Sequence, residues 1–179
     1  MQSPTTTLGS REDLDRVNSQ SVRRTITAAV RETVSIEGPI ELDRLARSIG
    51  QRFGYDRLRA TRKDFILDCV PRALIHGTQL GSFAWPEQLD RDTWRGFRST
   101  SVGVTRPLSE IAPEEIINAM AASCGPRGLD EEALMRETIG KFGQRRLTQG
   151  TTERLAACIA LAVKTGRLLR IGQTIRAGA

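Results

Sequence analysis

The chain has 179 residues and a net charge of +6, and 39% of its residues are hydrophobic while only 4% are aromatic. It contains no run of about 18 apolar residues, so we expect no transmembrane helix and no membrane partner. The first residues lack the pattern of a signal peptide, and an odd cysteine count without a CxxC motif favours a reducing cytoplasm. The scarcity of aromatic residues predicts an aliphatic core, which suits helices better than a β-sandwich.

Three cysteines and one histidine leave little material for redox or metal chemistry. Cys69, Cys124 and Cys158 are odd in number and form no CxxC motif, so we expect neither a disulfide nor a zinc site. His76 is expected at the end of a helix, as a surface or capping residue rather than a catalytic base. No glycine-rich nucleotide motif occurs. These observations predict a protein that is not an enzyme and that needs no cofactor and no metal.

The first part of the chain predicts a polar lead-in followed by three helices and a strand pair. Residues 1–20 are rich in serine and threonine, and we expect them to be flexible. Apolar residues recur at helical spacing after that point. Pro71 predicts a kink or an early end in the third helix, and Gly77 is expected to cap it. The expected elements are helices near 21–37, 42–53 and 61–76, then a strand or hairpin at 79–85.

The second part predicts a linker and then the same kinds of element. Residues 86–112 have no helical period and are expected to form the linker. Pro113 is expected to begin a fourth helix, where Glu114 and Glu115 favour the positive end of its dipole. Two further helices are expected to end at Gly143 and Gly166. The last element is a pair of short strands at 167–176 around a glycine-containing turn.

The two halves of the sequence align at a constant offset of 89 residues, without a gap from the end of the first helix to the hairpin. The aligned positions are apolar residues and glycines: Phe53-Gly54 with Phe142-Gly143, Cys69 with Cys158, Gly77 with Gly166, and Leu80 with Leu169. Each half runs helix, short turn or strand, helix, helix, hairpin, which is the winged-helix plan. We therefore predict a mainly α fold with short β-hairpins, in which two tandem winged-helix-like units occupy 21–85 and 113–179.

Positive charge is concentrated at the end of the chain. Residues 141–179 contain eight cations and one anion, a charge of +7, so the rest of the chain has a charge of −1. Such asymmetry favours a polyanionic partner. In a winged helix, the third helix and the wing approach nucleic acid. The residues predicted to bind nucleic acid are Arg145, Arg146, Arg154, Lys164, Arg167, Arg170 and Arg176.

Two other interpretations of the cationic segment stay open. The first is an ordinary solvated basic surface. The second is a protein-interaction or dimerisation module that does not contact nucleic acid, because Ala156, Ala157 and Ala160 on the outward side of the sixth helix form a smooth face. These alanines are also too short to reach base edges, so any DNA binding is expected to be largely independent of sequence. The sequence does not determine the oligomeric state.

Short motifs in both halves resemble an uncharacterised bacterial domain at the C-terminus of large superfamily-1 DNA helicases, often beside a restriction-type nuclease domain. They are Ile36-Glu37-Gly38-Pro39-Ile40-Glu41-Leu42, LARSIGQRFG at 45–54, Ile111-Ala112-Pro113-Glu114-Glu115-Ile116, and Gly166-Arg167-Leu168. The resemblance covers roughly residues 22–172. It implies an accessory role in bacterial DNA processing or defence, with a helicase or nuclease partner. Catalysis in that family belongs to the helicase and nuclease parts, which the resemblance does not include.

Overall fold

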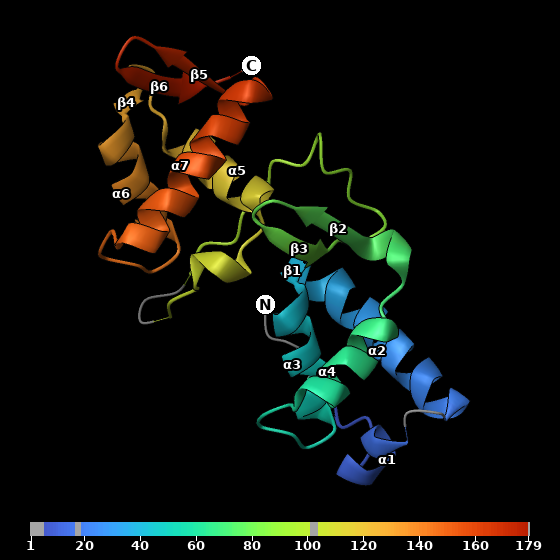
Figure 1. Cartoon of the computed structure of the whole chain (residues 1–179). Coiled ribbons are helices and arrows are strands. Elements are labelled where there is room, and N and C mark those ends of the chain that lie inside the picture. Colours follow the sequence, from blue (N-terminus) through green and yellow to red (C-terminus); the bar gives the residue numbers. More distant parts are fainter. Residues whose placement is uncertain (1–5, 17–18, 101–103, 179) are drawn as a thin grey trace. The chain divides into compact units, whose positions relative to one another are not determined.

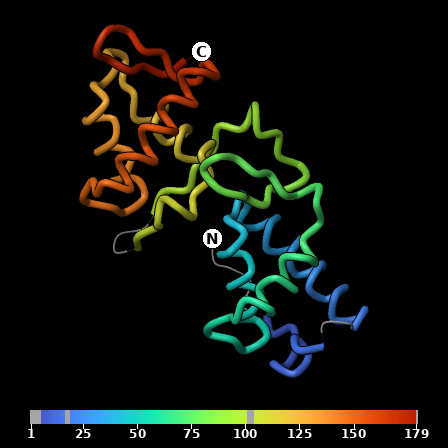
Figure 2. The backbone as a smooth tube through the Cα atoms, in the orientation of Figure 1, coloured from blue at the N-terminus to red at the C-terminus, as the bar shows by residue number. Residues whose placement is uncertain are grey.

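A computed structural model describes residues 6–16, 19–100 and 104–178, which form seven α-helices and two three-stranded antiparallel sheets (Figure 1). The fold is therefore mixed rather than mainly helical. The chain divides into two compact units, Met1–Asp90 and Arg91–Ala179. The backbone passes from the first unit to the second once (Figure 2). No helix in the described ranges has the length and apolar character needed to cross a bilayer.

The first unit packs its helices around an aliphatic core. The core includes the fully buried side chains of Ile26, Val30, Leu45, Ile49 and Ile66. A sheet with strand order β1-β3-β2 completes the unit. Its elements are α1 (Arg11–Asp15), α2 (Gln20–Glu37), β1 (Ile40–Glu41), α3 (Leu42–Arg52), α4 (Ala60–Asp68), a 3-10 turn (Arg72–Leu74), β2 (Ile75–Thr78) and β3 (Gly81–Ala84).

Residues 1–20 were predicted to be a flexible lead-in, and the parts of them that the structure describes have defined contacts instead. Residues 6–16 include helix α1, whose capping box is formed by Ser10 and Asp13. Leu14 of this helix is fully buried in the core of the first unit. The Arg11 guanidinium donates to the carbonyl of Gly54 at 2.6 Å. Burial of Leu14 and these polar contacts order residues 6–16, whose composition suggested disorder. Residues 1–5 and 17–18 lie outside the described part.

The third predicted helix ends early, as Pro71 indicated. Helix α4 stops at Asp68 with Cys69 as its C-cap, because proline cannot supply the next helical hydrogen bond. Gly77 is therefore not a helix cap, and His76 is not at a helix end. Both residues lie in strand β2, where His76 pairs with Phe83 of β3. The predicted strand pair is a β2–β3 hairpin, to which β1 adds a third strand.

The second unit repeats the order helix, strand, helix, helix, hairpin, but it has no described counterpart of α1 and its 3-10 turn lies before its first helix. Its parts are a 3-10 turn (Leu108–Glu110), α5 (Pro113–Ser123), β4 (Leu129–Asp130), α6 (Glu131–Lys141), α7 (Gln149–Lys164), β5 (Leu168–Ile171) and β6 (Thr174–Ala177). The sheet order, β4-β6-β5, corresponds to that of the first unit. The end of the predicted linker packs on the second unit, because Leu108 and Ile111 are buried and the Arg106 N–H donates to the carbonyl of Phe142 at 3.1 Å; residues 101–103 lie outside the described part.

The offset of 89 residues holds in the structure only through the first part of each unit. It places β1 on β4 and α3 on α6 with the same bounds. It fails at the hairpins, because β2 and β5 begin 93 residues apart, at Ile75 and Leu168. Helix α7 is longer than α4, which accounts for the added residues. The predicted matches of Gly77 with Gly166 and of Leu80 with Leu169 are therefore wrong.

Equivalent glycines after α3 and α6 differ in their surroundings. Gly54 and Gly143 have positive φ angles of 81° and 75°, which strain any other residue. A methyl group at Gly54 meets nothing closer than 3.7 Å, whereas at Gly143 it overlaps the carbonyl oxygen of Val104. The backbone at Val104 therefore lies directly against Gly143, at the start of the α6–α7 loop.

We expect Gly143→Ala to be clearly more destabilising than Gly54→Ala. Backbone strain alone costs about 1 kcal/mol at Gly54. The overlap with Val104 raises the loss to about 3 kcal/mol at Gly143, by analogy with overpacking. Urea unfolding followed by circular dichroism measures both free energies of unfolding. Equal losses would show that the segment at Val104 moves aside without cost.

Candidate nucleic-acid interface

The loop between α6 and α7 presents two neighbouring arginines to solvent. Arg145 and Arg146 are exposed, and neither makes a hydrogen bond or ion pair within the described ranges. The loop itself, from Gly143 to Thr148, contains no acidic residue. Its two guanidinium groups therefore keep their full capacity to bind an anionic ligand.

Helix α7 begins directly after this loop. The Thr148 hydroxyl accepts from the Thr151 N–H, and Thr151 caps the Thr148 N–H in return, so the end of the helix is fixed by a capping box. The helix dipole adds positive potential at this end. The nearest acidic residue of the helix, Glu153, accepts a hydrogen bond from Gln149 at 2.9 Å. The start of α7 thus favours negatively charged groups.

A groove of 970 Å³ lies beside the start of α7. One wall is the α6–α7 loop with the first turns of α7, and the other is the segment from Thr105 to Ser109. Pro107 and Leu108 supply apolar surface, and three arginines supply charge. The cations that line the groove are Arg145, Arg146 and Arg154. This groove combines a surface for apolar contact with a cationic rim.

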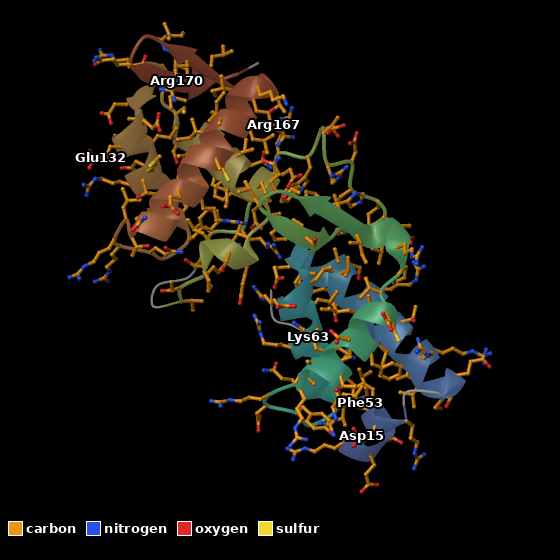
Figure 3. All side chains as sticks on the ribbon, in the orientation of Figure 1. Asp15, Phe53, Lys63, Glu132, Arg167 and Arg170 are labelled. Atoms are coloured by element: carbon orange, nitrogen blue, oxygen red, sulfur yellow. The ribbon has the colours of Figure 1, made fainter. Side chains whose placement is uncertain are left out.

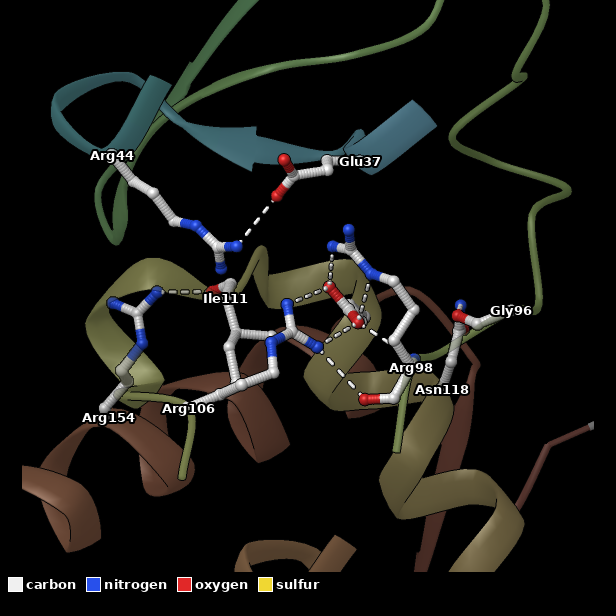
Figure 4. A network of polar contacts seen from close by, with 9 residues as sticks. Glu37, Arg44, Gly96, Arg98, Arg106, Ile111, Asn118 and Arg154 are labelled. Carbon is white, nitrogen blue, oxygen red and sulfur yellow. Dashed lines mark hydrogen bonds and ion pairs between the residues drawn. The ribbon is translucent and has the colours of Figure 1, made fainter. Parts of the chain in front are cut away.

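A buried ion pair network holds the second wall of the groove in place (Figure 4). The Glu115 carboxylate is fully buried and accepts from Arg98 at 2.7 Å and from Arg106 at 2.7 Å. Burial by itself raises the pKa of Glu115, but the hydrogen bonds from the two arginines outweigh it, so the pKa lies below its ordinary value. From the sequence, Glu115 was predicted only to interact favourably with the helix dipole, and nothing in the sequence indicated its two arginine partners.

Three of the predicted nucleic-acid-binding residues are engaged inside the second unit. The guanidinium of Arg154 donates to the carbonyl of Ile111 at 2.8 Å, and burial lowers its pKa. Arg170 of β5 pairs with Glu131, the first residue of α6, at 2.6 Å. Arg167 lies before the hairpin and Arg170 within it (Figure 3). These contacts leave fewer donors for a ligand than the sequence suggested.

Arg167 holds the segment that precedes α5. Its guanidinium donates to the Asn118 side chain at 2.9 Å and to the carbonyls of Asp92 at 2.8 Å and Trp94 at 2.9 Å. Asn118 in turn donates to the carbonyl of Gly96 at 2.8 Å. With its donors directed at protein acceptors, Arg167 is placed to stabilise the fold rather than to bind phosphate.

We expect Arg167→Ala to lower the free energy of unfolding by about 2 kcal/mol, because it removes several hydrogen bonds from a charged donor. Lys164→Ala is the matched control, since the Lys164 side chain is exposed and makes no hydrogen bond or ion pair within the described ranges. Its effect is expected within about 0.5 kcal/mol. Chemical unfolding measures both, and an unchanged stability of Arg167→Ala would show that the contacts around Arg167 contribute nothing.

The remaining two predicted residues, Lys164 and Arg176, are exposed. They lie away from the loop Gly143–Thr148 that carries Arg145 and Arg146, which we call the arginine loop. Helix α7 has 16 residues, which corresponds to a length of about 24 Å. The arginine loop is at one end, and Lys164 and the β5–β6 hairpin are at the other (Figure 1). The seven predicted cations therefore form two separate groups and not one continuous patch.

At the corresponding place the first unit also has exposed arginines, Arg57 at the position of Arg146 and Arg59 at that of Thr148, but beside an acidic residue. Asp56 occupies the position of Arg145 at the offset of 89 residues. In α4, Arg62 pairs with Asp15 at 2.6 Å and Lys63 pairs with Asp43 at 3.1 Å. Acidic residues of other elements thus neutralise Arg62 and Lys63, whereas Arg57 and Arg59 make no ion pair within the described ranges. At this place the units differ mainly in Asp56, because the Gly143–Thr148 loop of the second unit contains no acidic residue.

Residues 15–63 match a family described as a protein of unknown function (DUF3320). The DUF3320 match spans α2, β1, α3 and the first turn of α4, all in the first unit. It includes the motifs at 36–42 and 45–54. It does not reach the arginine loop. Neither the curated proteins nor the solved structures contain a match to the chain.

Proposed function

We propose that the chain is a non-catalytic DNA-binding accessory module that contacts phosphates through its second unit. The observation that supports this most is the pair of exposed, unneutralised guanidinium groups of Arg145 and Arg146 at the start of α7. Arginine is well suited to bind phosphate, since its planar donors match the phosphate oxygens. The groove beside the loop offers space for a nucleic-acid backbone.

The proposed fold of each unit is a winged helix. The order helix, strand, helix, helix, hairpin occurs twice, and in each unit the first short strand pairs with the second strand of the hairpin. In this interpretation α4 and α7 are the third helices, and the β2–β3 and β5–β6 hairpins are the wings. The loop before the third helix would then face DNA, which agrees with the position of Arg145 and Arg146.

Binding is proposed to be largely independent of DNA sequence. Along α7, Ala160 is exposed and Ala156 and Ala157 are partly exposed, and none of these methyl groups reaches a base edge with a hydrogen bond. Contacts to phosphate position a protein on DNA without reading its sequence. The module would therefore supply affinity to a larger machine and leave specificity to other parts.

The partner proposed for this module is a bacterial helicase–nuclease system for DNA processing or defence. The motifs in the DUF3320 match and the Ile111–Ile116 string support it through their resemblance to a helicase-associated domain. Chemistry would then be supplied by the helicase and nuclease parts. A module of this kind needs affinity for DNA and for its partner, and no catalytic residues of its own.

Fluorescence anisotropy with labelled duplex and single-stranded DNA tests the proposal on the whole chain. We expect saturable binding at low salt that weakens steeply as salt rises, because each phosphate contact releases condensed counterions. Oligonucleotides of different sequence and equal length are expected to bind equally. Absence of binding to either form at low salt contradicts the proposal and favours a module that contacts only protein.

A further inference from the structure

Strand β5 forms an open edge of the second sheet. The strand order is β4-β6-β5, so only one side of β5 is paired. The Gly178 N–H donates to the carbonyl of Arg167, its opposite residue, at 2.8 Å. Hydrogen-bonded pairs alternate along antiparallel strands, so the next residues of β5 that are hydrogen-bonded to β6 are Leu169 and Ile171. The backbone N–H and carbonyl groups of Leu168 and Arg170 therefore point to the open side, where another strand can pair with them.

The outer face of this hairpin is apolar as well as open. Leu169 and Ile171 are 47% and 52% exposed, and residues two apart in a strand share a face. The opposite face buries Leu168 and Ile175 completely. Natural sheets usually protect an edge strand with charges or proline, and β5 instead presents two large aliphatic side chains next to its free backbone groups. Together these features form a surface for an added strand.

The corresponding strand of the first unit does not have this surface. At the hairpin offset of 93 residues, Leu169 corresponds to His76 and Ile171 to Thr78. Strand β2 is also the outer strand of its sheet, yet it carries polar side chains at both positions. The fold therefore does not require aliphatic residues here. Their presence in β5 alone indicates a role specific to the second unit.

The charge around β5 identifies the kind of partner. No acidic residue occurs after Glu153 in the sequence. Lys164 precedes the hairpin and Arg176 lies opposite Leu169, and both are exposed without a partner in the described ranges. Among the described residues, the only carboxylate that bonds to a side chain of β5 is that of Glu131, and it is paired with Arg170. A second copy of this chain would bring like charges together, whereas an acidic segment would be attracted.

We infer that β5 binds an extended acidic peptide of a partner protein as a fourth strand. Backbone groups of the peptide pair with those of Leu168 and Arg170, which is β-strand addition. Apolar side chains of the peptide pack on Leu169 and Ile171, and the positive charge of Lys164 and Arg176 attracts its carboxylates without direct contact. This surface lies at the other end of α7 from the arginine loop, so it does not depend on the DNA-binding proposal.

The test uses the full chain and a labelled ten-residue peptide that alternates glutamate and valine. A lysine–valine peptide of the same length is the control for charge. Fluorescence anisotropy is expected to detect saturable binding of the acidic peptide only. Absence of binding, or equal binding of both peptides, overturns the inference, and so does concentration-dependent self-association of the chain that the acidic peptide does not compete with.

Two pairs of variants locate the binding surface. L169T/I171T places β-branched threonine, which suits a strand, at both positions and is expected to weaken peptide binding at least tenfold, whereas H76A in β2 leaves it unchanged. R170P removes the outward N–H and is expected to abolish binding, while R170A removes the same ion pair and stays within about threefold. Circular dichroism checks folding. If R170P does not fold, L169T/I171T decides. Unchanged peptide binding there, or a loss of duplex DNA binding instead, overturns the inference.

Discussion

Replacing Arg145 and Arg146 together by glutamine is expected to weaken duplex DNA binding about 100-fold at low salt. Two phosphate contacts of about 1.4 kcal/mol each correspond to this factor. The slope of log affinity against log salt is expected to fall in magnitude by about 2, because two fewer counterions are released. Glutamine keeps much of the side-chain length, so the fold is preserved. Anisotropy titrations over a range of salt concentrations measure both quantities.

The control for this prediction is K164Q/R176Q, which removes the same charge from the other end of α7. Both residues are exposed, as Arg145 and Arg146 are. We expect this variant to lose less than about fivefold, as general electrostatic attraction would give. Equal losses in the two variants would show that DNA responds to total charge and not to the arginine loop. An unchanged affinity of R145Q/R146Q would remove this loop from the interface.

Glu115→Gln is expected to lower the free energy of unfolding by about 3 kcal/mol. The change leaves Arg98 and Arg106 without the buried carboxylate that neutralises them, and removing one partner of a buried pair is costly. Glu132→Gln is the control, because its ion pair with Arg136 is exposed on both sides. That pair is expected to contribute less than about 0.5 kcal/mol. Urea unfolding at neutral pH measures both.

We also expect Glu115 to make the stability of the protein sensitive to acid. The pKa of Glu115 in the folded protein lies below its ordinary value of 4.5. The unfolded chain therefore takes up the proton first as pH falls, so the stability from Glu115 is present above pH 4.5 and is lost as pH falls through the lower folded pKa. Glu115→Gln is expected to lose less stability over this window than the wild type. Parallel losses would show that other carboxylates cause the acid effect.

Disruption of this network is also expected to affect the groove. Arg106 lies between Thr105 and Pro107, which line the groove. Its backbone N–H donates to the carbonyl of Phe142, just before the arginine loop. Glu115 thus positions two segments that are far apart in the sequence. It is a positioning residue in the proposed interface and does not itself face a ligand.

Local signals predicted much of the fold. Proline at 71 and 113 and glycine at 54 and 143 marked helix ends correctly, because their backbone preferences act on the immediate chain. The apolar spacing identified the cores of both units. The offset of 89 residues matched α3 with α6, and it failed at the hairpins because an alignment of similar residues did not register the added length of α7.

The sequence by itself determined the repeated order of elements and the concentration of positive charge in residues 141–179. The tertiary structure alone decided which of those cations are free. Arg167 is held by the side chain of Asn118, 49 residues away, and Arg170 by Glu131, 39 residues away. Such acceptors come from other elements, so no local pattern reveals them. Arg145 and Arg146 stay available because they lie on a loop that no acidic residue of the described chain approaches within ion-pair distance.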